Sequence, residues 1–266
     1  MVFKPLIALA ATAVLLAVAA ALSPDRERGE LWAGARRRAV VGRPGGALAV
    51  SLSAFGIAAG IPLALGLVPG SAVLLIGALV APMVARVLLS DDPPEAFLAS
   101  GAWFVVLAWC VVAGALRFKS LDLSDALGAQ AVLGPAGIGG PTGSLGATAL
   151  ALVAGLLAAA MWASSLPRIS GSSEADSLDR VLRWGETTLA ATAVAAPLWG
   201  PSLGALALTP LGPGLSGRVA ISFLTTVAAV AAASVIRRGA EEVPPALALS
   251  VAAPTALAVL FTMGLR

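Results

Sequence analysis

The chain has 266 residues, of which 59% are hydrophobic and 12% charged, and its mean hydropathy is +0.95. Soluble globular domains carry about 25% charged residues, so this composition excludes an ordinary soluble enzyme. The sequence has no histidine, no tyrosine and one cysteine. These counts exclude a disulfide within the chain and remove the commonest ligands of metal and haem centres. The 17 basic residues outnumber the 14 acidic ones, a surplus that in such a chain is typical of membrane topology rather than nucleic-acid binding.

Apolar runs of 18 or more residues recur along the chain and predict an all-α, polytopic integral membrane bundle of about eight transmembrane helices. Each run is long enough for a hydrocarbon core about 30 Å thick. Gly56 and Gly60 have the spacing of close helix packing. Four tryptophans are interpreted as anchors at the membrane interface, namely Trp32, Trp103, Trp162 and Trp184. We expect one transmembrane domain over residues 1–266, with spans near 3–22, 47–69, 71–90, 96–117, 145–166, 187–208, 216–236 and 244–265.

Charged residues are distributed unequally between the predicted loops. Of the 17 basic residues, 12 belong to the side that holds the first, third, fifth and seventh loops. The positive-inside tendency makes that side cytoplasmic and places both termini outside, in a bacterial cytoplasmic (inner) membrane. All acidic residues except Asp122 and Asp125 share this side. They either balance the arginines on solvated loops or form a docking surface for soluble partners.

The first loop holds a basic cluster, Arg36, Arg37 and Arg38, followed by Arg43 in a turn. The segment can lie amphipathically in the headgroup region, where the cluster would bind anionic lipid. Ionisable residues are almost absent from the apolar spans, and Arg86 and Glu186, both near span ends, are the notable exceptions. A pump or secondary transporter usually needs charged groups at the midplane, so this pattern favours a protein that works at the cytoplasmic edge.

The fifth loop is the main candidate for function. Pro167 ends the fifth span, because proline cannot continue the helical hydrogen-bond ladder. The S-x-x-D pattern from Ser173 to Asp176 predicts a short helix that begins near Glu174. This helix is expected to connect to the sixth span, which begins near residue 187.

The acids of this loop allow two interpretations. Asp176–Arg180 and Asp179–Arg183 have the i,i+4 spacing of ion pairs on an exposed helix, as in a solvated connecting segment. Glu186 falls where the sixth span enters the bilayer, and an acid at that depth tends to face a protein interior or a wet cavity. The second interpretation is therefore an acidic loop that leads to a half-buried glutamate in a proton or substrate path.

The order of these segments resembles the membrane-anchor family of the proton-pumping NADH:quinone oxidoreductase (respiratory complex I), together with its counterparts in energy-converting hydrogenases and formate hydrogenlyase. Those proteins have eight spans with external termini. Residues 120–130, SLDLSDALGAQ, are similar to the family stretch G-S-L-S-L-S-D-I-V-A-A-Q. Residues 41–46 match the family pattern Q-x-R-x-G-P at Arg43 and Gly45, but without its glutamine and final proline.

The fifth loop carries the remaining similarity. The family has E-A-E followed by a glutamate twelve residues after its first acid. This chain has Glu174 and Asp176 in that motif and Glu186 at that spacing. Two extra residues follow Pro167, and the family's glutamate at the entrance of the fourth span has no counterpart here.

The resemblance implies a membrane-anchor and coupling subunit that binds no cofactor itself. Its partners would be soluble iron–sulfur and catalytic subunits (quinone-site or NiFe) on the cytoplasmic side, antiporter-like membrane subunits and lipid, with quinone at the subunit interface. The expected coupling and proton path consists of Glu174, Asp176, Asp179 and Glu186. The expected contacts with the partner or the quinone site are Arg43, Arg36, Arg37, Arg38, Arg180 and Arg183. A small-solute permease, or the membrane component of a transporter, and a structural membrane scaffold stay open as alternatives.

Overall fold

The computed structural model describes residues 3–22, 46–90, 92–116, 120–123, 125, 143–167, 173–199 and 215–240. This part of the chain forms seven helices and no strand. The helices are α1 (Phe3–Ala21), α3 (Gly46–Ala64), α4 (Ala72–Leu88), α5 (Pro93–Leu116), α7 (Gly143–Ser165), α8 (Ser173–Trp199) and α10 (Leu215–Ala240). The predicted helical class is therefore confirmed. The eighth predicted span, 244–265, lies outside the described residues.

Two of these helical stretches, Gly46–Ala64 and Pro93–Ala115, are long and apolar enough to cross a membrane by length and composition. Shorter apolar stretches lie in α1, α4 and α7. Six of the seven helices begin and end within a few residues of the predicted ranges. Their identity as membrane spans stays a prediction.

Helix α8 differs from its prediction. It begins at Ser173, as the capping pattern indicates, but runs without interruption to Trp199. The expected boundary near residue 187 is absent because Glu186 is paired inside the bundle and has no need of a solvated turn. One glycine at Gly185 costs a helix only about 1 kcal/mol, which does not end it.

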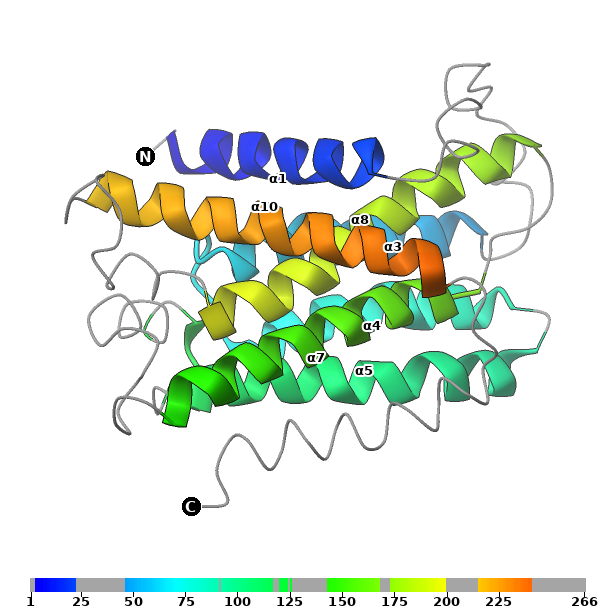
Figure 1. The fold of residues 1–266 in the computed structure, drawn as a ribbon. Helices are drawn as coiled ribbons and strands as arrows, with labels where there is room; N and C mark the ends of the chain where they lie inside the picture. Colours follow the sequence, from blue (N-terminus) through cyan, green and yellow to red (C-terminus); the bar gives the residue numbers. More distant parts are fainter. Residues whose placement is uncertain are drawn as a thin grey trace.

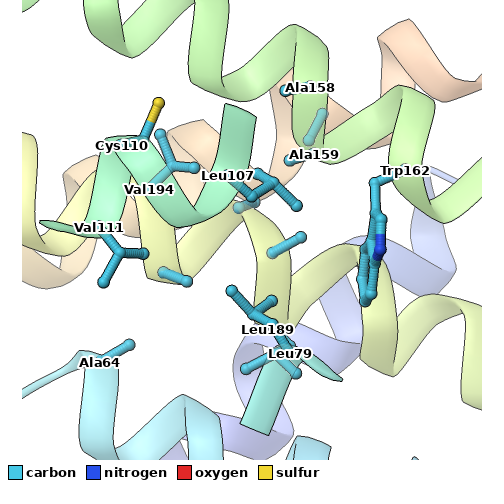
Figure 2. Close-up of a cluster of buried hydrophobic side chains, with 14 of the residues drawn as sticks. Ala64, Leu79, Leu107, Cys110, Val111, Ala158, Ala159, Trp162, Leu189 and Val194 are labelled. Carbon is cyan, nitrogen blue, oxygen red and sulfur yellow. The ribbon is translucent and has the colours of Figure 1, made fainter. Parts of the chain in front are cut away.

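Helix α8 is the central element of the bundle (Figure 1). It packs against α1, α3, α4, α5, α7 and α10. Its small side chains allow this close approach, since Ala190, Ala191 and Ala193 are fully buried. Figure 2 shows Leu189 and Val194 of this helix among residues of its neighbours.

The two glycines predicted to mediate packing do so. A Cβ atom on Gly56 would lie 2.6 Å from the carbonyl oxygen of Ala78 in α4. A Cβ atom on Gly60 would lie 2.4 Å from a methyl group of Leu189 in α8. The backbone of α3 therefore approaches both helices as closely as only glycine allows.

The interpretation as interface anchors is wrong for three of the four tryptophans, and the fourth, Trp32, lies outside the described residues. Trp103, Trp162 and Trp184 are 1%, 0% and 9% exposed, respectively, and belong to the core. Figure 2 shows Trp162 as part of the cluster of buried hydrophobic side chains. The neighbouring turns of α7 and α8 consist mainly of alanine, so large indoles fill the space between these helices.

Helix α4 connects the two ends of the bundle. Its first turn is capped by Ser71, whose hydroxyl accepts a hydrogen bond from the Leu74 amide. The Ala72 amide donates to the carbonyl of Leu121, and the Leu123 amide to that of Gly70. This end is therefore fastened to the segment after α5, while the last turn of α4 places Arg86 at the opposite end.

Candidate functional site: a buried charge network

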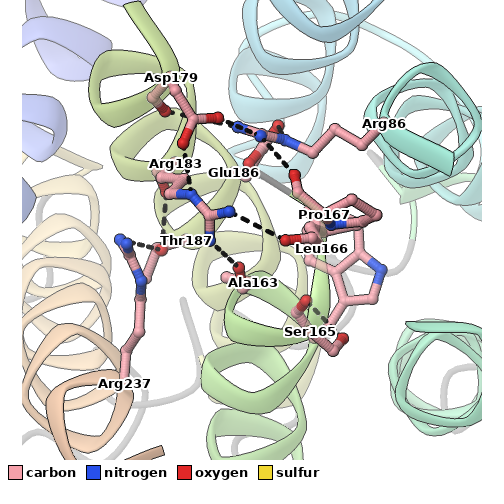
Figure 3. A network of polar contacts seen from close by, with 11 residues as sticks. Arg86, Ala163, Ser165, Leu166, Pro167, Asp179, Arg183, Glu186, Thr187 and Arg237 are labelled. Atoms are coloured by element: carbon pink, nitrogen blue, oxygen red, sulfur yellow. Dashed lines mark hydrogen bonds and ion pairs between the residues drawn. The ribbon is translucent and has the colours of Figure 1, made fainter. Parts of the chain in front are cut away.

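Arg86 is the centre of a charge network inside the bundle (Figure 3). The residue is 1% exposed. Its Nε atom donates to Glu186 Oε1 at 2.6 Å, and its Nη1 atom forms an ion pair with Asp179. The same Nη1 atom donates to the carbonyl oxygen of Pro167 at 3.0 Å. One guanidinium thus joins α4 to two carboxylates of α8 and to the second residue after α7.

Arg183 forms the second half of the network. Its Nε atom donates to Asp179 Oδ2 at 2.9 Å, across one turn of α8. Its Nη2 atom donates to the Leu166 carbonyl at 2.9 Å, and Nη1 to the Ala163 carbonyl at 3.4 Å. The last carbonyls of a helix have no partner within it and carry its negative dipole end, so a guanidinium at this position stabilises the end of α7.

Thr187 connects the network to α10. Its hydroxyl donates to the Arg183 carbonyl at 2.8 Å and accepts a hydrogen bond from Arg237 Nη1 at 3.4 Å. Arg237 is 5% exposed. Four helices, α4, α7, α8 and α10, therefore meet at one set of polar side chains.

The electrostatics of the two acids differ. Burial opposes ionisation of Asp179, but Arg183 and Arg86 outweigh it and hold the pKa of this carboxyl below its usual value. Glu186 is 0% exposed, and its ion pair is with Arg86. Its second oxygen, Oε2, has no hydrogen-bond partner among the described residues. Asp179 thus has two cationic partners, whereas Glu186 is held through one oxygen by one cation.

Several of the predicted site residues are brought together. Asp179, Arg183 and Glu186 form the network described above. The predicted Asp179–Arg183 pair exists, but it is buried rather than exposed, because Arg86 and the end of α7 cover it. Arg180 lies on the same helix and is half-buried.

Other predicted residues are not tested by this geometry. Glu174 and Asp176 lie in the first turns of α8, and nothing is described of their side chains. The four arginines of the first loop lie outside the described residues, namely Arg36, Arg37, Arg38 and Arg43. Their contacts with a partner or a quinone stay predictions, as does a partner contact of Arg183.

The sequence analysis did not assign Arg86 and Arg237 to the site. Arg86 carried a signal, because it is an ionisable residue within an otherwise apolar predicted span and such residues are costly unless paired. Arg237 lies beside Arg238 at a helix end, where a role in topology is sufficient to explain it. Only the packing of α10 on α8 distinguishes the buried arginine from the exposed one.

Chemically, the network can hold helices together and can hold a proton at Glu186. Among the described residues no group of three or more acids or cysteines is close enough to hold a metal ion. No family model matches the chain, and no curated protein or solved structure is significantly similar to it. The resemblance to the complex I membrane anchor therefore rests on sequence motifs, and it contributes to function as a proposal.

Proposed function

We propose that this chain is a multi-pass protein of a bacterial cytoplasmic membrane, the anchor and coupling subunit of a multi-subunit oxidoreductase. The oxidoreductase is of the complex I or energy-converting hydrogenase type. The chain binds no cofactor itself. It holds soluble iron–sulfur and catalytic subunits on its cytoplasmic side, and their reaction is linked to proton or ion movement through the acids of α8.

Large apolar side chains on the outside of the bundle support the membrane part of the proposal. Leu9 of α1, Phe55 of α3, Leu74 of α4, Val153 of α7 and Leu224 of α10 are each 61–71% exposed. Exposed apolar surface of this extent needs a lipid or protein neighbour. The exception is α8, whose one large exposed apolar residue among those described is Val181, as expected for a helix that other helices surround.

The observation that carries the coupling part is the burial of Glu186 beside Arg86 on the central helix. A carboxylate in the interior is costly, and chains retain such groups mainly at ion and proton pathways. Arg86, Pro167, Asp179 and Arg237 all belong to the side of the bundle that the arginine distribution makes cytoplasmic. A redox partner docked there would be next to the network.

Purification from native membranes in a mild detergent tests the proposal. We expect the tagged chain to co-purify with subunits that contain iron–sulfur clusters, identified by mass spectrometry and by their electron paramagnetic resonance signals. Arg238→Gln, an exposed residue at the end of α10, serves as a control variant and should co-purify with the same subunits. A chain that purifies alone or with an ATPase instead supports a permease and contradicts the proposal.

A further inference from the structure

The two carboxylates of the network depend on Arg86 to different degrees. Asp179 is bound through Oδ1 by Arg86 and through Oδ2 by Arg183. Within the described part of the chain, Glu186 has one ion pair, with Arg86 through Oε1. If Arg86 moves or is removed, Asp179 therefore keeps a cation in direct contact and Glu186 does not.

The surroundings of Glu186 provide little to replace Arg86. Among the described residues, the charged groups that act on it are Arg86 from α4 and Asp179 and Arg183 on α8, while Arg237 of α10 contacts the neighbouring Thr187. Asp179 is also an anion, and Arg183 is engaged with Asp179 and with the carbonyls of α7. A buried carboxylate that loses its cation takes up a proton rather than stay charged.

We propose that Arg86 is a positioning residue that sets the proton occupancy of Glu186. While the guanidinium is in contact with Oε1, Glu186 is a carboxylate. When the guanidinium withdraws toward Asp179, Glu186 takes up one proton from water, and the return of Arg86 releases it. Oε2, which has no partner in the described part of the chain, is the oxygen on which that proton can be held.

This inference rests on the proposed function only where it connects the proton on Glu186 to the redox reaction of partner subunits. The charge state of Glu186 itself can be measured in the purified protein without any redox reaction. Failure of the spectroscopic test would therefore remove Arg86 from this role and leave the anchor function standing. Conversely, a chain without redox partners could still show the predicted spectra.

Infrared spectroscopy of the purified full-length protein tests the proposal. The Arg86→Gln variant should gain one protonated carboxyl band per chain relative to wild type, shifted in deuterated water as a carboxylic acid requires. The double variant Arg86→Gln/Glu186→Gln should lose this band, which assigns it to Glu186. Arg183→Gln and Arg238→Gln should add no such band, because Glu186 keeps Arg86 in both.

A structural role alone would destabilise the protein without moving a proton to Glu186. Absence of the additional band in a folded Arg86→Gln protein therefore overturns the proposal, as does a band that survives in the double variant. If Arg86→Gln does not fold, Glu186→Asp provides the test. The aspartate carboxyl is one methylene farther from Arg86, while Arg86, Asp179 and Arg183 are unchanged. The same protonated carboxyl band is therefore expected. Its absence equally overturns the proposal.

Discussion

At the residue scale, the Arg183 side chain shows how much one residue can contribute to the stability of the fold. It neutralises Asp179 and satisfies the last carbonyls of α7 at the same time. Removing one partner of a buried ion pair typically costs about 3–5 kcal/mol, because the other charge is left uncompensated. The Arg183→Gln variant should lose part of that amount, because Arg86 still compensates Asp179 while the carbonyls of Ala163 and Leu166 lose their donor.

Thermal unfolding in detergent measures this loss. Arg238→Gln is the matched control, since Arg238 is an exposed arginine at a helix end. We expect Arg183→Gln to melt at a clearly lower temperature than the wild-type protein and Arg238→Gln to melt at almost the wild-type temperature. Equal melting temperatures for the two variants would show that the buried contacts of Arg183 add nothing to stability.

Sequence reasoning reached part of the site at this scale. Glu186 could be predicted because an acid at a span entrance is costly, and the Asp179–Arg183 pair because of its spacing. The partner of Glu186 could not be predicted, since Arg86 is 100 residues distant in sequence and only the packing of α4 on α8 brings it near. The burial of the Asp179–Arg183 pair could not be predicted either, because it also depends on how α4 and α7 pack on α8.

At the scale of the helices, a single glycine, Gly56, decides how closely α3 and α4 can pack. Alanine in place of Gly56 would place its Cβ 2.6 Å from the Ala78 carbonyl oxygen and 2.9 Å from Pro82 Cδ. Both contacts are with parts of α4 that cannot rotate away, so α3 and α4 must separate. Overpacking of this kind costs about 1–3 kcal/mol.

The Gly77→Ala variant is the control for Gly56→Ala. Gly77 lies in the middle of α4, and a Cβ atom there would meet nothing within 4 Å. Alanine should stabilise this position by about 0.5–1 kcal/mol, because it restricts the unfolded backbone. Opposite shifts in melting temperature are expected, and a shift of the same sign for both would contradict the described packing of α3 on α4.

The helices themselves could be predicted well from apolar runs, prolines and the capping pattern at Ser173. Two features of the helices could not be predicted from the sequence. The continuity of α8 depends on Glu186 being satisfied within the bundle, which local sequence does not reveal. The burial of Trp103 and Trp162 depends on how small the facing side chains are, whereas their places in the sequence indicate only proximity to a span end.

The orientation of the whole molecule can be tested with cysteine labelling. Cys110 is fully buried, so the native chain should give little background. Leu121 is 46% exposed at the end of the bundle predicted to be external, and Arg238 is exposed at the end predicted to be cytoplasmic. A membrane-impermeant maleimide should label Leu121→Cys in intact cells and Arg238→Cys only after the membrane is opened.

Labelling with the reverse pattern would invert the proposed topology and place the charge network on the external side. Labelling of both cysteines in intact cells would contradict a membrane between them. The chain without added cysteine, treated in the same way, controls for reaction at Cys110.

The central claim is that Glu186, held inside the bundle by Arg86, links the redox reaction of partner subunits to proton movement. Its most direct test is proton release per electron transferred, measured in sealed vesicles that contain the complex with either wild-type chain or Glu186→Gln. The account predicts that the variant assembles with its partners, because Arg86 keeps Asp179 and the Pro167 carbonyl, and that coupled proton release is lost. A wild-type ratio of protons to electrons in that variant would contradict the account.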